Sequence, residues 1–188
     1  MKPPSQKECF QLIHDMKMMD HIIDHSIMVG NVAVCLGTHL KRRFPAINME
    51  LLISAALLHD ITKTRSFKTG ELHSKTGGRL LDQMGYPQVG NIIRQHVLLD
   101  AGWEKHPITE IQIVNYSDKR VLHDKVVPLY KRFKYIKKRY GGEKKFQKRI
   151  QKLCDASCLL EKNLFATLPF KAEDLIDHTY PVIQKQIL

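Results

Sequence analysis

The sequence contains no long apolar run. The longest one is Leu51–Leu58, in which Ser54 is the single polar residue, and it is far shorter than the roughly 20 apolar residues that a membrane-spanning helix needs. The first residues, MKPPSQKE, also lack the apolar segment of a secretion signal. We therefore expect a soluble, cytoplasmic protein with no membrane partner.

Cysteine is also scarce. Four cysteines in 188 residues are too few for a disulfide framework, and Cys154 and Cys158 have a spacing that suits helix packing better than a redox pair. The length and the 43% hydrophobic content are typical of one compact globular domain. We expect a single domain over residues 1–188, with a motif core over about 22–122. A basic helical hairpin and a last helix are expected over about 124–188.

Strand patterns are missing as well. Apolar residues recur at helical spacing throughout, and strict alternation is nowhere sustained over the length of a strand. Asn48 is a good N-cap, and Thr109 with Gln112 has the pattern of a capping box. The sequence therefore predicts an all-α fold, with a polar loop around Gly70. The expected helices cover about 4–19, 22 toward 45, 48–58, 74–84, 87–97, 109–122, 124–140, 143–165 and 172–186.

Acidic residues are outnumbered, at 19 against 30 lysines and arginines, which gives a net charge of +11. The excess is concentrated in residues 131–152, where eleven basic residues stand with the single acid Glu143. Such a segment attracts polyanions or needs acidic cover from elsewhere in the fold. Its interleaved aromatics, such as Phe133 and Tyr140, suit base stacking, but their spacing is also that of an ordinary buried helix face. The second interpretation is favoured, so nucleic acid is the less favoured partner.

Polar residues stand at three places where the helical pattern requires apolar ones. They are His25, His96 and Asp118. Apolar residues lie three or four positions before and after His25 and Asp118, and three and four positions before His96. A single buried histidine with a backbone partner is common in protein cores. A buried carboxylate is harder to explain, because it costs several kcal/mol unless a cation or hydrogen-bond donors compensate.

The adjacent pair His59-Asp60 follows directly after the apolar run. Consecutive helix residues diverge by about 100°, so both can reach one ion only near a helix end. With His25 and Asp118, this pair would supply two imidazoles and two carboxylates. Such a ligand set suits Fe, Mn, Zn or Mg.

Two further histidines are candidates for a second ion. His73 and His96 would hold it beside the first, with Asp60 bridging the two. Two ions about 3.5–4 Å apart can clamp the attacking and leaving oxygens of a phosphate ester. His73 fits equally well as a histidine in a surface loop. The remaining histidines, among them His21 and His123, are assigned to the surface or to packing.

The order of these residues resembles the HD-domain superfamily of metal-dependent phosphohydrolases. The resemblance covers about residues 22–120. The full pattern of residues is similar to the H…HD…H…H…D branch with a dinuclear centre, which includes bacterial dinucleoside-polyphosphate hydrolases. It implies an all-helical bundle with two divalent ions, a bridging Asp60, and Lys63 facing the substrate phosphate. The residues that carry the resemblance are His25, His59 and Asp60 in LLHDITK, His73 in HSKTGG, His96 in IIRQH, and Asp118.

The expected function is therefore hydrolysis of a phosphoester or phosphoanhydride bond in a small phosphorylated molecule, such as a nucleotide or dinucleoside polyphosphate. Asp60 and Lys63 are the expected catalytic residues, and Lys119 and Arg120 are weaker candidates for substrate contact. The alternative is a non-enzymatic, metal-containing module that binds nucleic acid or an acidic partner through the basic hairpin. The sequence leaves the substrate, the native metal and the oligomeric state open.

Overall fold

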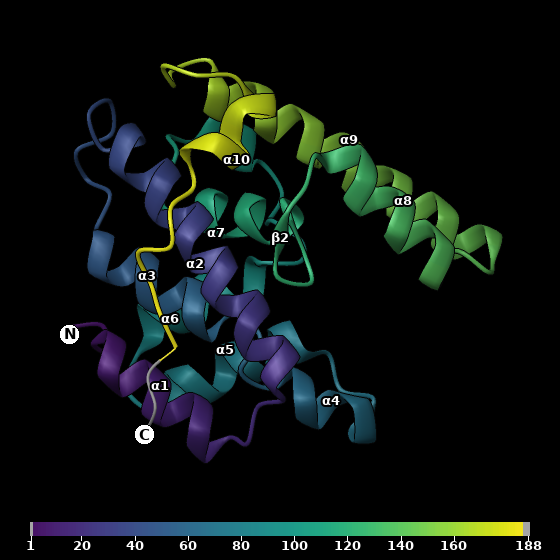
Figure 1. The fold of residues 1–188 in the computed structure, drawn as a ribbon. Coiled ribbons are helices and arrows are strands. Elements are labelled where there is room, and N and C mark those ends of the chain that lie inside the picture. The colour runs from purple at the N-terminus through teal and green to yellow at the C-terminus, as the bar shows by residue number, and fades with distance from the viewer. Residues whose placement is uncertain (1, 186–188) are drawn as a thin grey trace.

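A computed structural model describes residues 2–185, and the fold is all-α apart from one minimal pair of strands. The helices pack around a common core, with a pair of helices projecting from it (Figure 1). The elements in chain order are α1 Gln6–Asp15, α2 Asp20–Leu40, α3 Met49–Leu58, α4 Lys63–Thr69, α5 His73–Gln83, α6 Pro87–Gln95, η1 Trp103–Lys105, α7 Glu110–Lys119, β1 Val121–Leu122, β2 Lys125–Val126, α8 Leu129–Tyr140, α9 Lys144–Phe165, η2 Ala172–Asp174 and α10 Leu175–His178.

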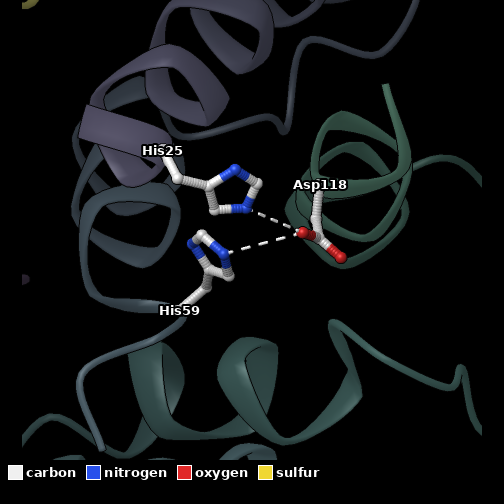
Figure 2. Close-up of side chains that lie close together, drawn as sticks. All are labelled: His25, His59 and Asp118. Carbon is white, nitrogen blue, oxygen red and sulfur yellow. Dashed lines mark hydrogen bonds and ion pairs between the residues drawn. The ribbon is translucent and has the colours of Figure 1, made fainter. Parts of the chain in front are cut away.

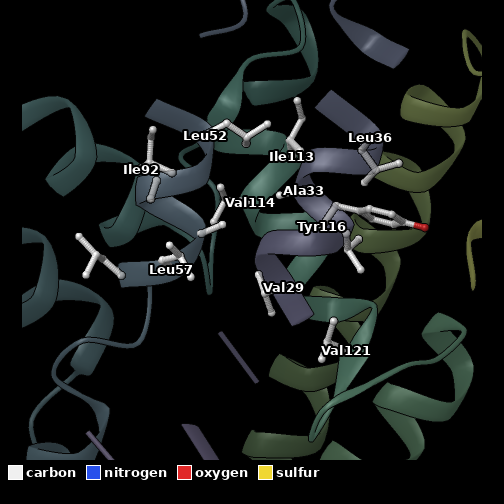
Figure 3. Packing of buried hydrophobic residues seen from close by; sticks show 14 of the residues in the cluster. Val29, Ala33, Leu36, Leu52, Leu57, Ile92, Ile113, Val114, Tyr116 and Val121 are labelled. Carbon is white, nitrogen blue, oxygen red and sulfur yellow. The ribbon is translucent and has the colours of Figure 1, made fainter. Parts of the chain in front are cut away.

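The core lies where α2, α3 and α7 meet. Val29 and Leu36 of α2, Leu57 of α3, and Ile113 and Tyr116 of α7 are completely buried (Figure 3). Burying a side chain of this size stabilises the fold by about 1.5–3 kcal/mol relative to leaving it exposed. These three helices therefore form a rigid frame. α2 and α7 carry polar residues of the candidate site, and α3 ends directly before two more.

The predicted helix starts at Asn48 and Thr109 are confirmed. The Asn48 side chain accepts hydrogen bonds from the backbone N–H groups of Glu50 and Leu51, at 3.0 and 3.1 Å. Thr109 and Gln112 form a capping box at the start of α7. Side-chain caps satisfy N–H groups that have no partner inside the helix, which fixes where α3 and α7 begin.

Several predicted boundaries are wrong. The expected polar loop before Gly70 contains the short helix α4, which ends at Gly70 in the left-handed conformation (φ 69°). The predicted helix over 109–122 ends at Lys119, because the next residues form β1 and pair with β2, Val121 facing Val126. The two strands account for the one departure from an all-α fold within residues 2–185.

The predicted final helix over 172–186 is also wrong for most of its length. Helical structure ends at His178, and residue 186 lies outside the described residues. Pro181 has no N–H to donate and disfavours helical backbone at Tyr180, so the helix cannot continue. The segment instead runs back past α2, where the N–H of Ile183 donates to Asn31 Oδ1 at 2.7 Å.

The basic hairpin consists of α8 and α9, which pack against each other and extend away from the body of the molecule (Figure 1). The predicted break at Gly141-Gly142 is confirmed, whereas the predicted start at residue 124 is five residues early because β2 occupies that segment. Within residues 2–185 no helix is both long enough and apolar enough to cross a membrane.

Candidate metal centre

The structure brings all six predicted ligand residues together at one place. Five elements contribute them, and all but one of the side chains stand at or near a helix end. They are His25 within α2, His59 and Asp60 just after α3, His73 at the start of α5, His96 just after α6, and Asp118 near the end of α7. Their close approach is a geometric finding, and their assignment as metal ligands stays a prediction.

The end of α3 explains how two consecutive residues reach one site. The helix ends at Leu58, and the following turn is held by hydrogen bonds from Ile61 N–H to the Leu58 carbonyl and from Lys63 N–H to the Asp60 carbonyl. The His59 and Asp60 side chains are both almost completely buried, at 0% and 1% exposed. Both side chains thus point into the protein interior, as expected for consecutive residues at a helix end.

One group of side chains forms around Asp118. His25 Nε2 lies 3.1 Å and His59 Nε2 lies 3.8 Å from Asp118 Oδ1 (Figure 2). The two imidazole rings lie nearly edge to face, with centroids 5.4 Å apart. All three residues are buried, and their facing atoms are close enough for one ion to contact them together.

A second group forms around Asp60. Its Oδ1 lies 3.3 Å from His73 Nε2 and 3.6 Å from His96 Nε2, whereas its Oδ2 lies 3.3 Å from His59 Nε2. His73, which fitted a surface loop equally well, is instead the first residue of α5 and faces this carboxylate. The two oxygens of Asp60 thus face different histidines.

Backbone carbonyls fix the tautomers of three imidazoles. Nδ1 of His25, His59 and His96 lies 2.7–2.8 Å from the carbonyl oxygens of His123, Ala56 and Ile93, respectively. A carbonyl oxygen only accepts hydrogen bonds, so each Nδ1 must carry the proton. In a neutral ring, Nε2 then presents a lone pair to the centre of the site.

These lone pairs face carboxylate oxygens, which are also acceptors. His59 Nε2 and Asp60 Oδ1 are buried and have no hydrogen-bond partner among the described residues. Unpaired buried acceptors are costly, and a positively charged species between them would satisfy both. The nitrogen and oxygen donors therefore fit a divalent ion, and carbonyl partners on Nδ1 are what metal-ligating histidines commonly have.

The electrostatics keep most of these groups in the state that binds metal. Burial lowers the pKa of His25, His73 and His96, which favours neutral rings. Burial alone would raise the pKa of Asp60 and Asp118, but nearby cationic groups outweigh it and hold both values well below the usual range. Neutral imidazoles and ionised carboxylates are the forms that coordinate divalent ions.

The pKa values of two groups next to Asp60 are raised. Burial alone would lower the pKa of His59 and of Lys63, but the Asp60 carboxylate outweighs it and raises both. Lys63 Nζ donates to Asp60 Oδ2 at 2.7 Å, one turn along the chain. Lys63 therefore lies beside the Asp60 carboxylate, and its predicted contact with a substrate phosphate stays a prediction.

A cavity of about 360 Å³ opens over the cluster, and all six residues except His59 line it. Its lining also includes four cations, which face the same space as the carboxylates: Lys63, Lys119, Arg132 and Arg139. Lys119 is buried and donates to the His96 carbonyl, whereas the other weak candidate, Arg120, lies elsewhere among structural partners. The cavity combines metal-binding side chains with positive charge suited to an anion.

Sequence reasoning missed several residues of this cavity. His123 was assigned to the surface or packing, yet its carbonyl holds His25 and its side chain lines the cavity, as does that of His21. Arg132 was counted only as one of the hairpin cations. Arg132 lies one helical turn before Ile136, but nothing in the sequence separates it from the other charged residues of this helix.

Fold and site together define a helical protein with buried histidine and aspartate clusters that could bind metal. The family model of the HD domain matches residues 22–156, and the chain belongs to this family. Proteins of the family are typically metal-dependent hydrolases. The chain is also 26% identical over 149 residues to an uncharacterized protein of Methanocaldococcus jannaschii, covering 72% of this chain and 87% of the relative. No solved structure matches it.

Proposed function

We propose that this protein is a metal-dependent phosphohydrolase that cleaves a phosphoester or phosphoanhydride bond in a nucleotide or dinucleoside polyphosphate. The observation that carries the proposal is the facing of imidazole lone pairs and carboxylate oxygens in a buried cluster, beneath a cavity lined by cations. Such an arrangement suits divalent ions together with an anionic substrate.

The proposed ligands form two sets that share Asp60. His25, His59, Asp60 and Asp118 would hold one ion, and His73, His96 and Asp60 would hold the other. Fe, Mn, Mg and Zn all accept nitrogen and oxygen ligands of this kind. When bound, the ions would polarise a phosphoryl oxygen and make water a stronger nucleophile near neutral pH.

The protein's own groups would perform the rest of the work. Asp60 would bridge the ions, and Lys63, held 2.7 Å from its Oδ2, would offset negative charge on the phosphoryl oxygens. The carbonyl groups on His25, His59 and His96 keep the imidazole rings oriented toward the ions. Burial of the cluster excludes bulk water, which strengthens each of these electrostatic interactions.

The substrate class is proposed from the size and charge of the cavity. A volume of about 360 Å³ lies in the range of small-molecule sites and is suited to a nucleotide. Aromatic side chains line its outer part, among them Phe67 and Tyr140, which are 56% and 57% exposed. Exposed rings beside a phosphate site suit a planar base, since every base offers a face for stacking.

The test is a screen of nucleotides, dinucleoside polyphosphates and a chromogenic phosphodiester with Fe, Mn, Mg and Zn in turn. Metal-dependent turnover of at least one substrate, abolished by a chelator and restored by the metal, is the expected result. No turnover with any metal, combined with tight and salt-sensitive binding of nucleic acid, would contradict the proposal. That result would instead support the non-enzymatic module with a nucleic-acid-binding hairpin.

A further inference from the structure

Arg132 differs from every other cation of the basic segment 131–152. The other ten lysines and arginines are exposed, whereas the Arg132 side chain is only 14% exposed. It points from α8 into the cavity over the six site residues. Placing a permanent positive charge in this interior costs free energy, so some negatively charged group must compensate.

The contacts of Arg132 within the protein do not satisfy it. One terminal nitrogen lies 3.5 Å from Asp118 Oδ1, a loose ion pair, and its Nε is buried with no hydrogen-bond partner among the described residues. A guanidinium carries five N–H donors, and each buried donor without an acceptor costs about 1–3 kcal/mol.

Arg120 shows what a purely structural arginine looks like in this fold. Its Nε donates to the Val127 carbonyl at 2.8 Å, and its terminal nitrogens donate to the Ala172 carbonyl, the Tyr116 hydroxyl and Glu161. The protein thus supplies acceptors to all three nitrogens of Arg120. The acceptors missing around Arg132 point to a ligand.

The chemistry of the missing acceptor follows from the neighbours of Arg132. The Asp118 oxygen that it approaches is the same one that faces His25 and His59, so a cation bound there would compete with the guanidinium for it. Two positive charges this close need an anion between them. A phosphate oxygen fits, because the planar fork of a guanidinium matches the spacing of phosphate oxygens.

We propose that Arg132 binds an oxygen of the substrate's phosphate group at the metal centre, which makes α8 of the basic hairpin a wall of the substrate pocket. The proposal rests on the proposed function, and it adds a substrate-binding residue outside the six-residue motif. Arg132 would contact the phosphate together with Lys63, since the two residues line one cavity from separate elements, α8 and α4.

The experiment compares Arg132→Gln, Arg132→Lys and the wild type, with Lys131→Gln as the matched control. Lys131 is the preceding residue of the same helix and is exposed. Each protein is loaded with Mn²⁺, its metal content is measured by elemental analysis, and its binding of inorganic phosphate is measured by calorimetry. We expect Arg132→Gln to weaken phosphate binding about tenfold to a hundredfold at unchanged metal content. Arg132→Lys should be intermediate, and Lys131→Gln should match the wild type.

Three results would overturn the proposal. The first is that all four proteins bind phosphate with equal affinity, and the second is that the metal-loaded wild type does not bind phosphate. The third is that Arg132→Gln loses metal while its phosphate affinity per bound metal is unchanged. The last would mean that Arg132 only positions Asp118. Turnover is measured separately, with Arg132→Gln expected to raise KM more than it lowers kcat. Phosphate binding that depends on Arg132 without any turnover would sink the proposed function but leave this inference standing.

Discussion

At the scale of single residues, the site depends on which nitrogen of each imidazole carries a proton. Three backbone carbonyls settle this for His25, His59 and His96. Two come from helix ends, and the third, that of His123, comes from the turn between β1 and β2. The Ala56 and Ile93 carbonyls each lie three residues before the histidine that they bind, at the free carboxyl end of a helix. Carbonyls at a helix end lack the N–H partner that they have inside the helix, so the same geometry that ends α3 and α6 orients His59 and His96.

Asp60 is the residue whose loss should matter most. Asp60→Ala removes the oxygens that face both groups of histidines, so we expect loss of bound metal and a fall in hydrolytic rate of at least about a hundredfold. The apolar faces of α2, α3 and α7 remain, so circular dichroism should show unchanged helicity. Asp82→Ala, which removes an exposed carboxylate from α5, is the control. Full activity with normal metal content in Asp60→Ala would contradict the catalytic role.

The sequence singled out His25, His96 and Asp118 because these polar residues interrupt apolar helix faces. It singled out His59-Asp60 because the pair follows an apolar run, whereas His73 had no comparable signal. The sequence could not distinguish Arg132 from its neighbours, because in a highly charged helix a buried arginine gives the same sequence pattern as an exposed one. Which face of α8 turns inward depends on how β1, β2 and Pro128 direct the chain after Asp118, and two-residue strands leave no periodic pattern. The contribution of the His123 carbonyl was equally invisible, since backbone groups are present at every position.

At the scale of elements, helix ends place most of the chemistry, and most of these ends could be predicted. The caps at Asn48 and Thr109 fixed the starts of α3 and α7. α4 was missed because its seven residues are mostly polar and have no buried face, so it has no apolar periodicity to detect. The last helix was extended too far because the effect of Pro181 was not weighed against the apolar spacing.

Arg120 joins α7 to the rest of the fold and provides a stability prediction. Its guanidinium contacts Tyr116, Glu161 of α9 and two backbone carbonyls, and its side chain is only 3% exposed. Arg120→Met should lower the free energy of unfolding by about 3 kcal/mol, because buried acceptors lose their donor. Urea unfolding measures the change, with Arg79→Met as an exposed control on α5. Equal stability of the two variants would show that the network contributes nothing.

At the scale of the whole molecule, charge and chain path are organised around the cavity. Nearly all of the excess positive charge lies on the projecting hairpin, whose inner face lines the cavity. The C-terminal segment runs back to α2 and binds Asn31 through Ile183. We propose on this basis that residues 1–188 act as one domain, with the hairpin as its charged extension.

The hairpin charge should act on how fast substrate arrives. Reversing Lys137, Lys138 and Lys144 together should lower kcat/KM and flatten its dependence on salt, with kcat little changed. Exposed charges act over roughly 8 Å at physiological ionic strength, so the effect should be largest in dilute buffer. Steady-state kinetics across a salt series measures it. An unchanged salt slope would mean that the hairpin charge does not guide the substrate.

The proposed hydrolase would act with one ion or with two, and His73 with His96 provides the test. Replacing both with Ala should leave His25, His59 and Asp118 in place, so the variant should fold and keep about half of the wild-type metal. Its rate should fall steeply, because one ion can still polarise a phosphoryl oxygen but can no longer act together with a second across Asp60.

Elemental analysis, circular dichroism and turnover on the same samples separate the outcomes. Loss of all metal would show that the two groups of side chains bind metal only together. This is the main alternative outcome, because both groups contact His59 and Asp60. Unchanged metal and unchanged rate would leave a mononuclear site in which neither histidine takes part.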